Sequence, residues 1–435
     1  MTNPPRRRAI ALAGAGVVVL VAAVYAIYLP VTRSYFYNDD FQWLQGGRQF
    51  DPAELLNLDR YVHFYRPVVE IYFALGSRLF GCQAQPFHLL SIGIHLLNAL
   101  VLYLFASALT GRRWFAGLAA LLFAMQPGYA EAVAWVGAIA EVLQALWFLL
   151  TLWLYLRFIQ SKNVAFYALS IVTFAACLFT HESSATLLPM MVALEIAVVW
   201  KRGAPDAPMS RWRRCVRYVP FALLLLGFLV IAYTVNSRSY IVREGHYQLG
   251  WHAVSNVLRY IVSLYVGKQR LTSYAVIAVT GVALLVAGNN RMRLFVLWIV
   301  IALAPASLFT WGNVSRYLYL SGAGFALLLA ELLVQCEDLA RRRWSLRSAR
   351  ALVSVVAVAI TIRFAVFTIG AARDFRGRTR PSERFVAALI RTNPAPQPGG
   401  TVYISRDDAK GLPDQYRDAA AEAAFCTADV RVEVR

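Results

Sequence analysis

The feature of this sequence that most constrains its fold is a series of long apolar runs along the 435 residues. Runs of this length and composition predict helices that cross a lipid bilayer, and we count about eleven of them, the third being short. They occupy residues 9–30, 86–109, 113–127, 141–158, 164–180, 184–201, 217–235, 271–287, 292–309, 316–335 and 350–370. The series predicts an all-α polytopic membrane protein and excludes a soluble two-domain protein.

The composition agrees with a membrane protein. Hydrophobic residues make up 59% of the chain and charged residues only 15%, which is fewer than a soluble protein of this length carries. The formal net charge of +19 does not require a nucleic-acid partner, because Lys and Arg also accumulate in the cytoplasmic loops of membrane proteins. We therefore expect the lipid bilayer, and no nucleic acid, among the partners.

The distribution of positive charge predicts the orientation. The sequence "PPRRR" before the first apolar run places the N-terminus in the cytoplasm, and that run is too long for a cleaved signal peptide. Every second turn is then basic: "GRRW", "RFIQSK", "KRGAPDAPMSRWRRCVR", "NNRMR" and "CEDLARRRWSLRSAR". We expect a multi-pass protein of the cell inner (plasma) membrane, with the other loops and the C-terminus on the extracytoplasmic side.

Two further apolar segments, residues 65–81 and 251–267, are predicted to lie on the membrane surface rather than to cross the bilayer. Counting the first as a crossing would place the following basic turns outside. The apolar face of the second is interrupted by His252, Asn256 and Arg259. Both segments are therefore expected as short helices on the outer face.

The last part of the chain differs in kind. Residues 372–435 are polar and contain two strand-like runs, "TVYIS" and "VRVEVR", with the helical "YRDAAAEAAF" between them. We expect a transmembrane domain over residues 1–371, with its first outer loop at 31–85, and a small βαβ-like extracytoplasmic module over 372–435. Cys82 and Cys426 fall on the same predicted side, but the sequence leaves their pairing open.

Unusual polar residues collect on the predicted outer face, close to helix ends. Ionisable groups at such depths are costly and tend to line a water-filled cavity. Acids and bases that converge at one membrane face suggest a site for a charged, lipid-anchored substrate. The residues are Asp39, Asp40, His63, Arg66, Glu131, Glu141, His181, Glu182, Arg243, His246, Lys268 and Arg316.

Simpler explanations exist for several of these residues. Asp39 or Asp40 could cap the helix predicted after them, since Asp is favoured at a helix N-terminus. Glu131 could complement a helix dipole, although "EAVAWVGAIAE" places Glu131 and Glu141 near one helical face and so predicts an acidic stripe. Arg316, like "HES" at 181–183, could be an interfacial anchor. The residues alone leave these alternatives open.

Five short motifs, taken in order, carry a resemblance to a known family. They are "NDD" at 38–40, "YRP" at 65–67, "QPGYAEAVAWVGAIAE" at 126–141, "HES" at 181–183 and "SRYLYLSGAGF" at 315–325. Together they resemble the GT-C superfamily of membrane glycosyltransferases, above all the tetratricopeptide-repeat O-mannosyltransferases and their bacterial relatives. The resemblance covers roughly residues 1–335 and implies a GT-C-like helix bundle.

This chain also departs from the family pattern. Gln126 stands where the family has histidine, Ile139 where it often has arginine, and His181 where it often has lysine. The tetratricopeptide repeats are absent, and the short tail stands in their place. These differences weaken any assignment of mannose as the sugar, whereas the acids and Arg316 match the pattern.

The resemblance implies a glycosyltransferase that moves a sugar from a polyprenyl-phosphate donor to an acceptor hydroxyl of a protein, glycan or lipid, on the extracytoplasmic face. It requires no cofactor, and a divalent metal is possible but not required. The expected catalytic residues are Asp40, the favoured base, Asp39 and Glu131. Those expected at the donor phosphate are Arg316, Arg66 and Lys268, and those expected to bind substrate are His63, His181, Glu182 and Tyr317.

Two other classes of protein are kept as alternatives. A transporter or flippase of a lipid-linked sugar would place ionisable residues near the bilayer midplane and often shows inverted repeats, and the sequence has neither feature. A non-catalytic membrane scaffold would leave the one-sided clustering of acids and bases unexplained. Release of polyprenyl phosphate from a lipid-linked sugar would distinguish the transferase from both.

Overall fold

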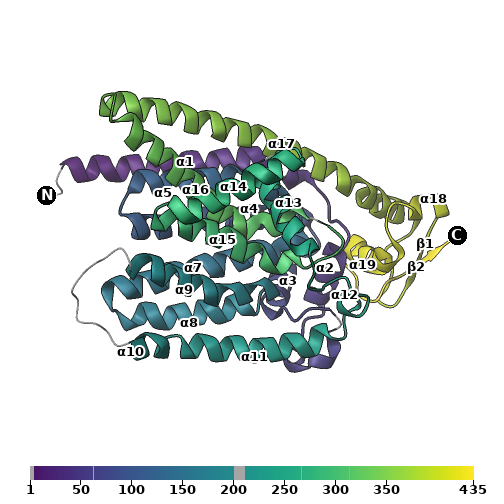
Figure 1. Cartoon of the computed structure of the whole chain (residues 1–435). Helices are drawn as coiled ribbons and strands as arrows, with labels where there is room; N and C mark the ends of the chain where they lie inside the picture. Colours follow the sequence, from purple (N-terminus) through teal and green to yellow (C-terminus); the bar gives the residue numbers. More distant parts are fainter. Residues whose placement is uncertain (1–3, 62, 200–210, 266, 313) are drawn as a thin grey trace.

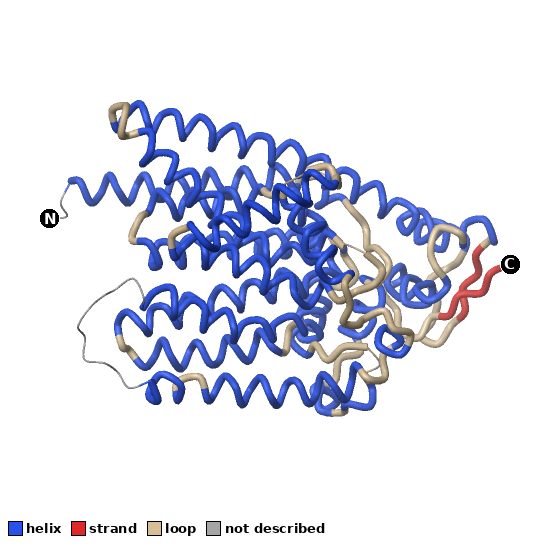
Figure 2. The backbone as a smooth tube through the Cα atoms, in the orientation of Figure 1, coloured by secondary structure: helices blue, strands red, loops and turns tan. Residues whose placement is uncertain are grey.

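The computed structural model describes residues 4–61, 63–199, 211–265, 267–312 and 314–435. These residues form a helical bundle with one pair of short strands near the C-terminus (Figure 2). The α-helices are α1 Pro4–Tyr28, α2 Asp40–Arg48, α3 Pro67–Phe80, α4 Ala84–Thr110, α5 Arg113–Met125, α6 Ala130–Ala134, α7 Ile139–Ser161, α8 Val164–Leu178, α9 Leu187–Val199, α10 Arg211–Val216, α11 Val219–Asn236, α12 Tyr240–Arg243, α13 His252–Leu264, α14 Leu271–Ala287, α15 Asn290–Ser307, α16 Leu318–Ala340, α17 Leu346–Thr392, α18 Arg406–Ala409 and α19 Asp414–Phe425.

Short 3₁₀ helices and the two strands complete the described secondary structure. They are η1 Val31–Arg33, η2 Pro52–Leu56, η3 Leu58–Arg60, η4 Pro127–Tyr129, η5 Val136–Ala138, η6 Glu182–Thr186, η7 Ser315–Tyr317, β1 Thr401–Ile404 and β2 Arg431–Val434.

All eleven predicted spans coincide with helices: α1, α4, α5, α7, α8, α9, α11, α14, α15, α16 and α17. Within the described residues, six helical segments are both long and apolar enough to cross a membrane, and four apolar helices are shorter. The prediction of a polytopic all-α membrane protein is therefore confirmed, whereas the count of eleven crossings is not. The predicted end of one span at residue 201 and the loop over 201–210 lie outside the described residues.

The helices run roughly side by side and have two distinct ends (Figure 1). The N-terminus, α10 and the start of α17 lie at one end. The helices α2, α3 and α12 lie at the other end, together with the C-terminal strands. Because α4, α7 and α14 each begin at the second end, the basic turns that follow them lie with the N-terminus. The alternation of basic and non-basic turns predicted from the sequence is thus reproduced by the arrangement of the helices.

The helices differ in how much of their surface the protein itself covers. The segments Val136–Ser161 and Ser315–Ala340 end with α7 and α16, and 83% of the residues in their most apolar stretches are buried. The corresponding share is 17% in α11 and 22% in α17. The first two form the centre of the bundle. The other two leave most of their apolar side chains on the outside, as expected for helices that face lipid.

Small residues allow α16 to pack closely at the centre. Gly322 lies against the ring of Tyr129 and Gly324 against the indole of Trp298, and neither place has room for a side chain. The Trp298 Nε1 donates a hydrogen bond of 3.1 Å to the Leu320 carbonyl. Small residues of this kind let helix backbones approach each other in membranes. The close packing fixes the start of α16 at Leu318, two residues after Arg316.

The two segments predicted as surface helices are both short helices. Residues 65–81 contain α3, which begins with Pro67 at its first position, a favoured place for proline. Residues 251–267 contain α13, which packs against α14 and α15 and buries Asn256, Tyr260, Val262 and Leu264. Neither segment is among the helices long enough to cross a membrane.

The C-terminal part has the predicted βαβ order. The strands β1 and β2 pair in parallel, with Val402 opposite Val432, and α19 lies between them in the sequence. Two helical connections tie this module to the bundle: α17 runs without a break across residue 371, and α19 packs on α2. A disulfide joins Cys82 to Cys426, a pairing that the sequence left open. The division into domains at residue 371 stays a prediction.

Candidate active site

A cavity opens where the loops meet at the end of the bundle that carries α2 and α3. Its volume is about 660 Å³, including space open to solvent. Half of the ten site residues predicted from the sequence line it, namely His63, Arg66, His181, Glu182 and Tyr317. The rest of the lining is Phe64, Ser183, Asn236, Ser239, Ile241, Val242, Tyr247, Pro305, Ala306 and Phe309. The structure thus brings together residues that are up to 254 positions apart.

Arg66 and Glu182 form an ion pair on one wall of the cavity. The Arg66 Nε donates to both Glu182 carboxylate oxygens at 3.2 Å, and Nη2 donates to Oε2 at 2.6 Å. The guanidinium also lies 4.2 Å above the ring of Phe64. Burial raises the pKa of the Glu182 carboxyl, but Arg66 and His181 lower it more, so that its pKa lies below the ordinary value. Both members of the pair are therefore charged at neutral pH.

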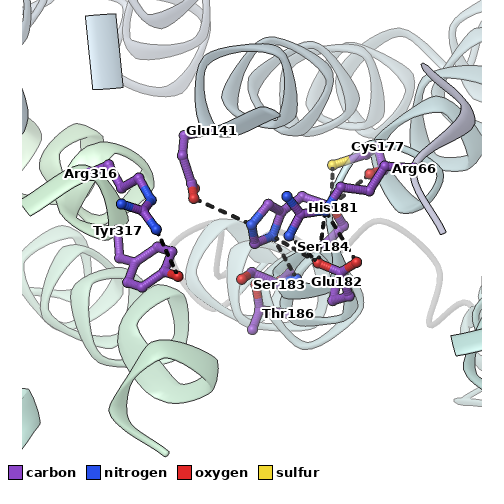
Figure 3. Close-up of polar contacts among 10 residues, drawn as sticks. All are labelled: Arg66, Glu141, Cys177, His181, Glu182, Ser183, Ser184, Thr186, Arg316 and Tyr317. Carbon is purple, nitrogen blue, oxygen red and sulfur yellow. Dashed lines mark hydrogen bonds and ion pairs between the residues drawn. The ribbon is translucent and has the colours of Figure 1, made fainter. Parts of the chain in front are cut away.

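His181 links this pair to a second acid. Its Nδ1 accepts a hydrogen bond of 3.1 Å from the Ser183 backbone N–H at the start of η6. Nε2 therefore carries the proton of the neutral ring and points at Glu141 Oε1, 3.3 Å away (Figure 3). Both side chains are buried. Because both ring nitrogens have partners, the orientation of His181 is fixed.

In Figure 3, Arg316 lies next to Tyr317, and Glu141 is drawn between Arg316 and His181. Its guanidinium carbon is 5.0 Å from the ring centres of both Trp135 and Tyr317. Its nearest carboxylate contact is a 3.6 Å approach to Glu131 Oε1, and its hydrogen bond to the Tyr317 hydroxyl is long, at 3.5 Å. Arg316 is therefore held mainly by aromatic rings, and its donors are only weakly engaged by the described residues.

The predicted acidic stripe of Glu131 and Glu141 is wrong. The helix breaks between them, because α6 ends at Ala134 and Trp135 has extended backbone angles of φ −90° and ψ 120°. Glu131 accepts a hydrogen bond from the Ser315 hydroxyl, whereas Glu141 contacts His181. Helical spacing across ten residues cannot detect such a break.

Asp40 is fully buried, and its carboxylate orients the chain around it. Oδ2 accepts from the Tyr37 N–H at 2.8 Å, and Oδ1 accepts from the Gly137 N–H at 2.5 Å. The Trp135 Nε1 donates to the Tyr37 carbonyl at 3.2 Å, which joins the same two segments. Burial raises the pKa of the Asp40 carboxyl well above its usual range, although the two backbone N–H groups act in the opposite direction.

Asp39 is half-buried and points toward the C-terminal module. Its Oδ1 accepts a hydrogen bond of 2.5 Å from the hydroxyl of Tyr416, a residue of α19. Oδ2 accepts no hydrogen bond from any residue that the structure describes. Asp39 occupies the N-cap position of α2 but its side chain makes no capping bond, and Asp40 bonds upstream of the helix. The simple capping explanation therefore fails for both acids.

The preference for Asp40 as the base is not supported by this geometry. A general base must come within hydrogen-bond reach of a substrate hydroxyl. Asp40 has no exposed surface and bonds to two backbone N–H groups, whereas Asp39 keeps one oxygen open. The assignment of the base itself stays a prediction.

Lys268 is not brought to the cavity. It lies exposed in the loop between α13 and α14, and its carbonyl accepts a hydrogen bond of 2.9 Å from Ser273 Oγ. The sequence predicted only that Lys268 is on the outer face, and in the fold Lys268 is not among the residues that line the cavity.

The remaining predicted residues form parts of the wall. His63 lies 3.5 Å from Ser239 Oγ and edge-on to Tyr240. Tyr317 stacks on Phe309, with ring centres 5.6 Å apart and planes at 8°. The aromatic and amide residues opposite them, such as Tyr247, carry no motif in the sequence.

The fit of a divalent metal can be judged from the acidic pair. The Asp39 and Asp40 carboxylates bond to different partners and so do not converge on one point. Among the described residues, no group of three or more His, Cys, Asp or Glu side chains has a metal-binding arrangement. We therefore assign no step to a metal ion.

The bundle has the fold of the GT-C glycosyltransferases. It is similar to the crystal structure of ArnT from Cupriavidus metallidurans, with a TM-score of 0.50 and 14% identity, covering 97% of this chain and 86% of that chain. A structure of the same ArnT bound to undecaprenyl phosphate gives the same score and identity, with coverage of 96% and 85%. At this identity the likeness shows the fold alone.

In sequence, the chain is similar to protein O-mannosyl-transferase TMTC1 of Homo sapiens, with 30% identity over 178 residues, which is 37% of this chain and 20% of that protein. It is also similar to TMTC2 of Mus musculus, with 31% identity over 99 residues, 23% of this chain and 12% of that protein. The match thus spans a fifth or less of these curated relatives. No family model matches the chain. The resemblance to the tetratricopeptide-repeat O-mannosyltransferases predicted from the sequence is confirmed.

Proposed function

We propose that this protein is a membrane glycosyltransferase that moves a sugar from a polyprenyl-phosphate donor to an acceptor hydroxyl. The observation that carries the proposal is the cavity at one end of a GT-C-like bundle, whose lining includes the Arg66–Glu182 ion pair and His181. Next to this lining, Glu141 contacts His181 and Arg316 approaches Glu131. A lipid-linked donor would present its phosphate and sugar at this depth, beside the ends of the helices. The ArnT structure with undecaprenyl phosphate shows that a protein of this fold binds such a lipid.

Arg316 is the better candidate of the two arginines for the donor phosphate. Arg66 already makes three charge-assisted hydrogen bonds to Glu182. The guanidinium of Arg316 is placed over the rings of Trp135 and Tyr317 and keeps most of its donors for a ligand. A guanidinium fork matches two phosphate oxygens, so Arg316 can bind the phosphate in the ground state and stabilise the charge it gains as the bond breaks.

The reaction has one bond-forming and one bond-breaking event at the anomeric carbon. The acceptor hydroxyl oxygen forms the new glycosidic bond, and the bond between that carbon and the phosphate oxygen breaks, leaving its electron pair on polyprenyl phosphate. The hydroxyl proton passes to a carboxylate acting as general base. The transition state is oxocarbenium-like, as in other glycosyl chemistry. The scheme is balanced without a nucleotide or a redox partner.

We assign the base to Asp39 rather than Asp40. One oxygen of Asp39 is held by Tyr416, and the other accepts no hydrogen bond from the residues that the structure describes. Asp40 keeps the role of holding residues 37 and 137 together, beneath the Trp135 ring that supports Arg316. In this scheme the two adjacent acids have different and complementary roles.

The site is proposed to face the extracytoplasmic side. The basic turns lie with the N-terminus at the opposite end of the bundle, as expected for cytoplasmic loops. The Cys82–Cys426 disulfide lies at the end that carries the cavity, which agrees with an oxidising compartment.

The sugar and the acceptor are proposed only as classes. The name of the TMTC relatives points to mannose and to a protein acceptor, but this chain has His181 and Ile139 at positions where their family often has lysine and arginine. We therefore propose a hexose donor on a polyprenyl phosphate and an acceptor hydroxyl on a protein or glycan.

The function is tested with purified protein in lipid nanodiscs and polyprenyl-phosphate sugars labelled in the sugar. Release of polyprenyl phosphate together with transfer of label to a hydroxyl acceptor is the expected result. Arg316→Ala is the inactive comparison, and Arg270→Ala, at an exposed arginine on the same face, is the matched control. Movement of an intact sugar lipid across vesicle bilayers, with no cleavage of the donor, would instead support a transporter or flippase.

A further inference from the structure

We propose that Tyr416 of the C-terminal module is a positioning residue that orients the Asp39 carboxylate, so that the module completes the catalytic site. The inference rests on the proposed function and deepens it, because nothing in the resemblance to known families assigns a role to this tail. It arises from a single long-range contact: the Tyr416 hydroxyl donates to Asp39 Oδ1 at 2.5 Å, across 377 positions of the sequence.

The hydroxyl of Tyr416 is suited to hold a carboxylate. Burial and the neighbouring Asp39 raise the pKa of Tyr416 to about 12, so the group remains a protonated donor throughout the physiological range. The bond occupies one carboxylate oxygen and leaves the second without a partner among the described residues. A short hydrogen bond at one oxygen fixes the rotation of the whole carboxylate, and therefore the direction of the open lone pairs.

The docking of the module does not depend on this one hydrogen bond. Three side chains on one face of α2 also reach α19 and the residue that follows it. Gln42 donates to the Gln415 carbonyl at 3.2 Å and Gln45 to Glu422 Oε1 at 2.9 Å. Arg48 donates to the Cys426 carbonyl at 2.9 Å and to the Glu422 carbonyl at 3.2 Å. Residues spaced by three along a helix share a face, which explains why all of them meet α19.

A covalent link holds the module from another side. Cys82 lies between α3 and α4, and its disulfide to Cys426 fixes the end of α19 to the bundle. Loss of one tyrosine hydroxyl is therefore expected to leave the module docked and folded. This separates the positioning role of Tyr416 from a purely structural one.

The effect expected from Tyr416→Phe is catalytic. A hydrogen bond to a charged group contributes enough to predict a fall in kcat of about 10- to 100-fold, with the donor KM unchanged. Gln45→Ala removes a docking contact of similar length that does not touch Asp39, and it is expected to keep kcat within about twofold of the wild type. A lower kcat with an unchanged KM indicates that the base is misoriented, whereas a higher KM indicates weaker binding of the donor.

A double-mutant cycle with Asp39→Asn tests whether Tyr416 acts through Asp39. If it does, Tyr416→Phe lowers kcat in the wild-type background and changes nothing further in the Asp39→Asn background. Equal losses in both backgrounds would overturn the proposal, as would a wild-type kcat in Tyr416→Phe. Full activity of Asp39→Asn would show that Asp39 is not the base. The proposal would then fail as well, because Tyr416 is proposed to act through Asp39.

Hydrogen–deuterium exchange of the full-length protein provides a readout that needs no activity. Tyr416→Phe is expected to speed exchange in residues 35–42 and to leave 401–404 and 414–425 unchanged. Faster exchange throughout the C-terminal module would show that Tyr416 has a structural role. No change in exchange at any residue would show that the Tyr416 hydroxyl does not order the segment that carries Asp39. Either result would overturn the proposal. If the wild type transfers no sugar at all, the proposed function fails, while this measurement still decides whether Tyr416 orders the segment that carries Asp39.

Discussion

Arg66, which lines the cavity, and Arg316, which lies next to the cavity residue Tyr317, are held in opposite ways, and the difference predicts their roles. Arg66 is neutralised by a bidentate carboxylate, whereas Arg316 rests on aromatic rings and approaches Glu131 at 3.6 Å. An arginine whose donors are already satisfied stabilises the wall, and one whose donors are weakly engaged can bind an anion. The experiments below separate these two roles.

Arg316→Lys is expected to lower kcat/KM for the lipid-linked donor by about 10- to 100-fold, and Arg316→Ala at least as much, because an ammonium group cannot make a bidentate contact with phosphate. Initial rates over a range of donor concentrations measure the effect. Arg270→Ala controls for the loss of a positive charge on the same face. Wild-type kinetics in Arg316→Ala would show that Arg316 does not bind the donor phosphate.

The Arg66–Glu182 pair predicts a pH dependence of stability. The pKa of Glu182 is lowered in the folded state, so the unfolded chain takes up a proton first as the pH falls. The stabilisation is complete above the unfolded value of about 4.3 and is lost as the pH falls through the lower folded value. The Tm of the wild type should therefore exceed that of Glu182→Gln at pH 7, and the gap should shrink at acidic pH. A gap that is constant down to about pH 3.5 would contradict this assignment.

The sequence predicted part of this site and missed part of it, for a physical reason. His63, Arg66, His181, Glu182 and Tyr317 were recognisable as polar groups near helix ends, where burial without a purpose is costly. The same argument selected Lys268, which the fold leaves in an exposed loop. The contact of Tyr416 with Asp39 joins positions 377 residues apart, and no local pattern records it.

At the scale of elements, the helix break at Trp135 matters most. Helical spacing places Glu131 and Glu141 on one continuous helical face, but the structure has α6, η5 and then α7 across these residues. The break lets the Gly137 N–H reach Asp40 and turns the Trp135 ring toward Arg316. The spacing predicted the helices correctly and could not predict the interruption, because tertiary hydrogen bonds of Asp40 stabilise it.

The packing of α2 on α3 yields a paired prediction from adjacent glycines. A methyl group at Gly47 would come within 2.6 Å of the backbone of Phe73, whereas nothing lies within 4 Å of Gly46. Gly47→Ala is therefore expected to destabilise the protein by about 1–3 kcal/mol through overpacking. Gly46→Ala should stabilise α2 by about 0.5–1 kcal/mol through its better helix propensity. Thermal unfolding in detergent compares the two, and equal Tm values for both variants would refute the close approach of α2 to α3.

For the whole molecule, the alternation of apolar runs and basic turns was sufficient to predict a multi-pass helical bundle. It could not predict how the C-terminal module docks. That arrangement depends on α2, on α17 and on a disulfide between residues 344 positions apart. The bilayer constrains each span separately and so leaves a clear pattern in the sequence, whereas the docking of a polar module depends on surfaces that form only after folding.

The orientation of the molecule can be tested with cysteines that the chain already has. Cys215 and Cys336 are exposed and belong to the predicted cytoplasmic turns, Cys177 is buried, and Cys82 and Cys426 are joined to each other. A membrane-impermeant thiol reagent applied to intact cells should therefore leave the wild type unlabelled and should label it once the membrane is permeabilised.

Lys410→Cys provides the opposite control, because Lys410 is exposed in the C-terminal module. It should be labelled in intact cells, and prior blocking with an impermeant maleimide should abolish that signal. Labelling of Cys336 in intact cells, with Lys410→Cys protected, would invert the bundle and place the cavity on the cytoplasmic side. A donor whose sugar faces outward would then be unable to reach Arg316, so this measurement tests the proposed reaction as well as the topology.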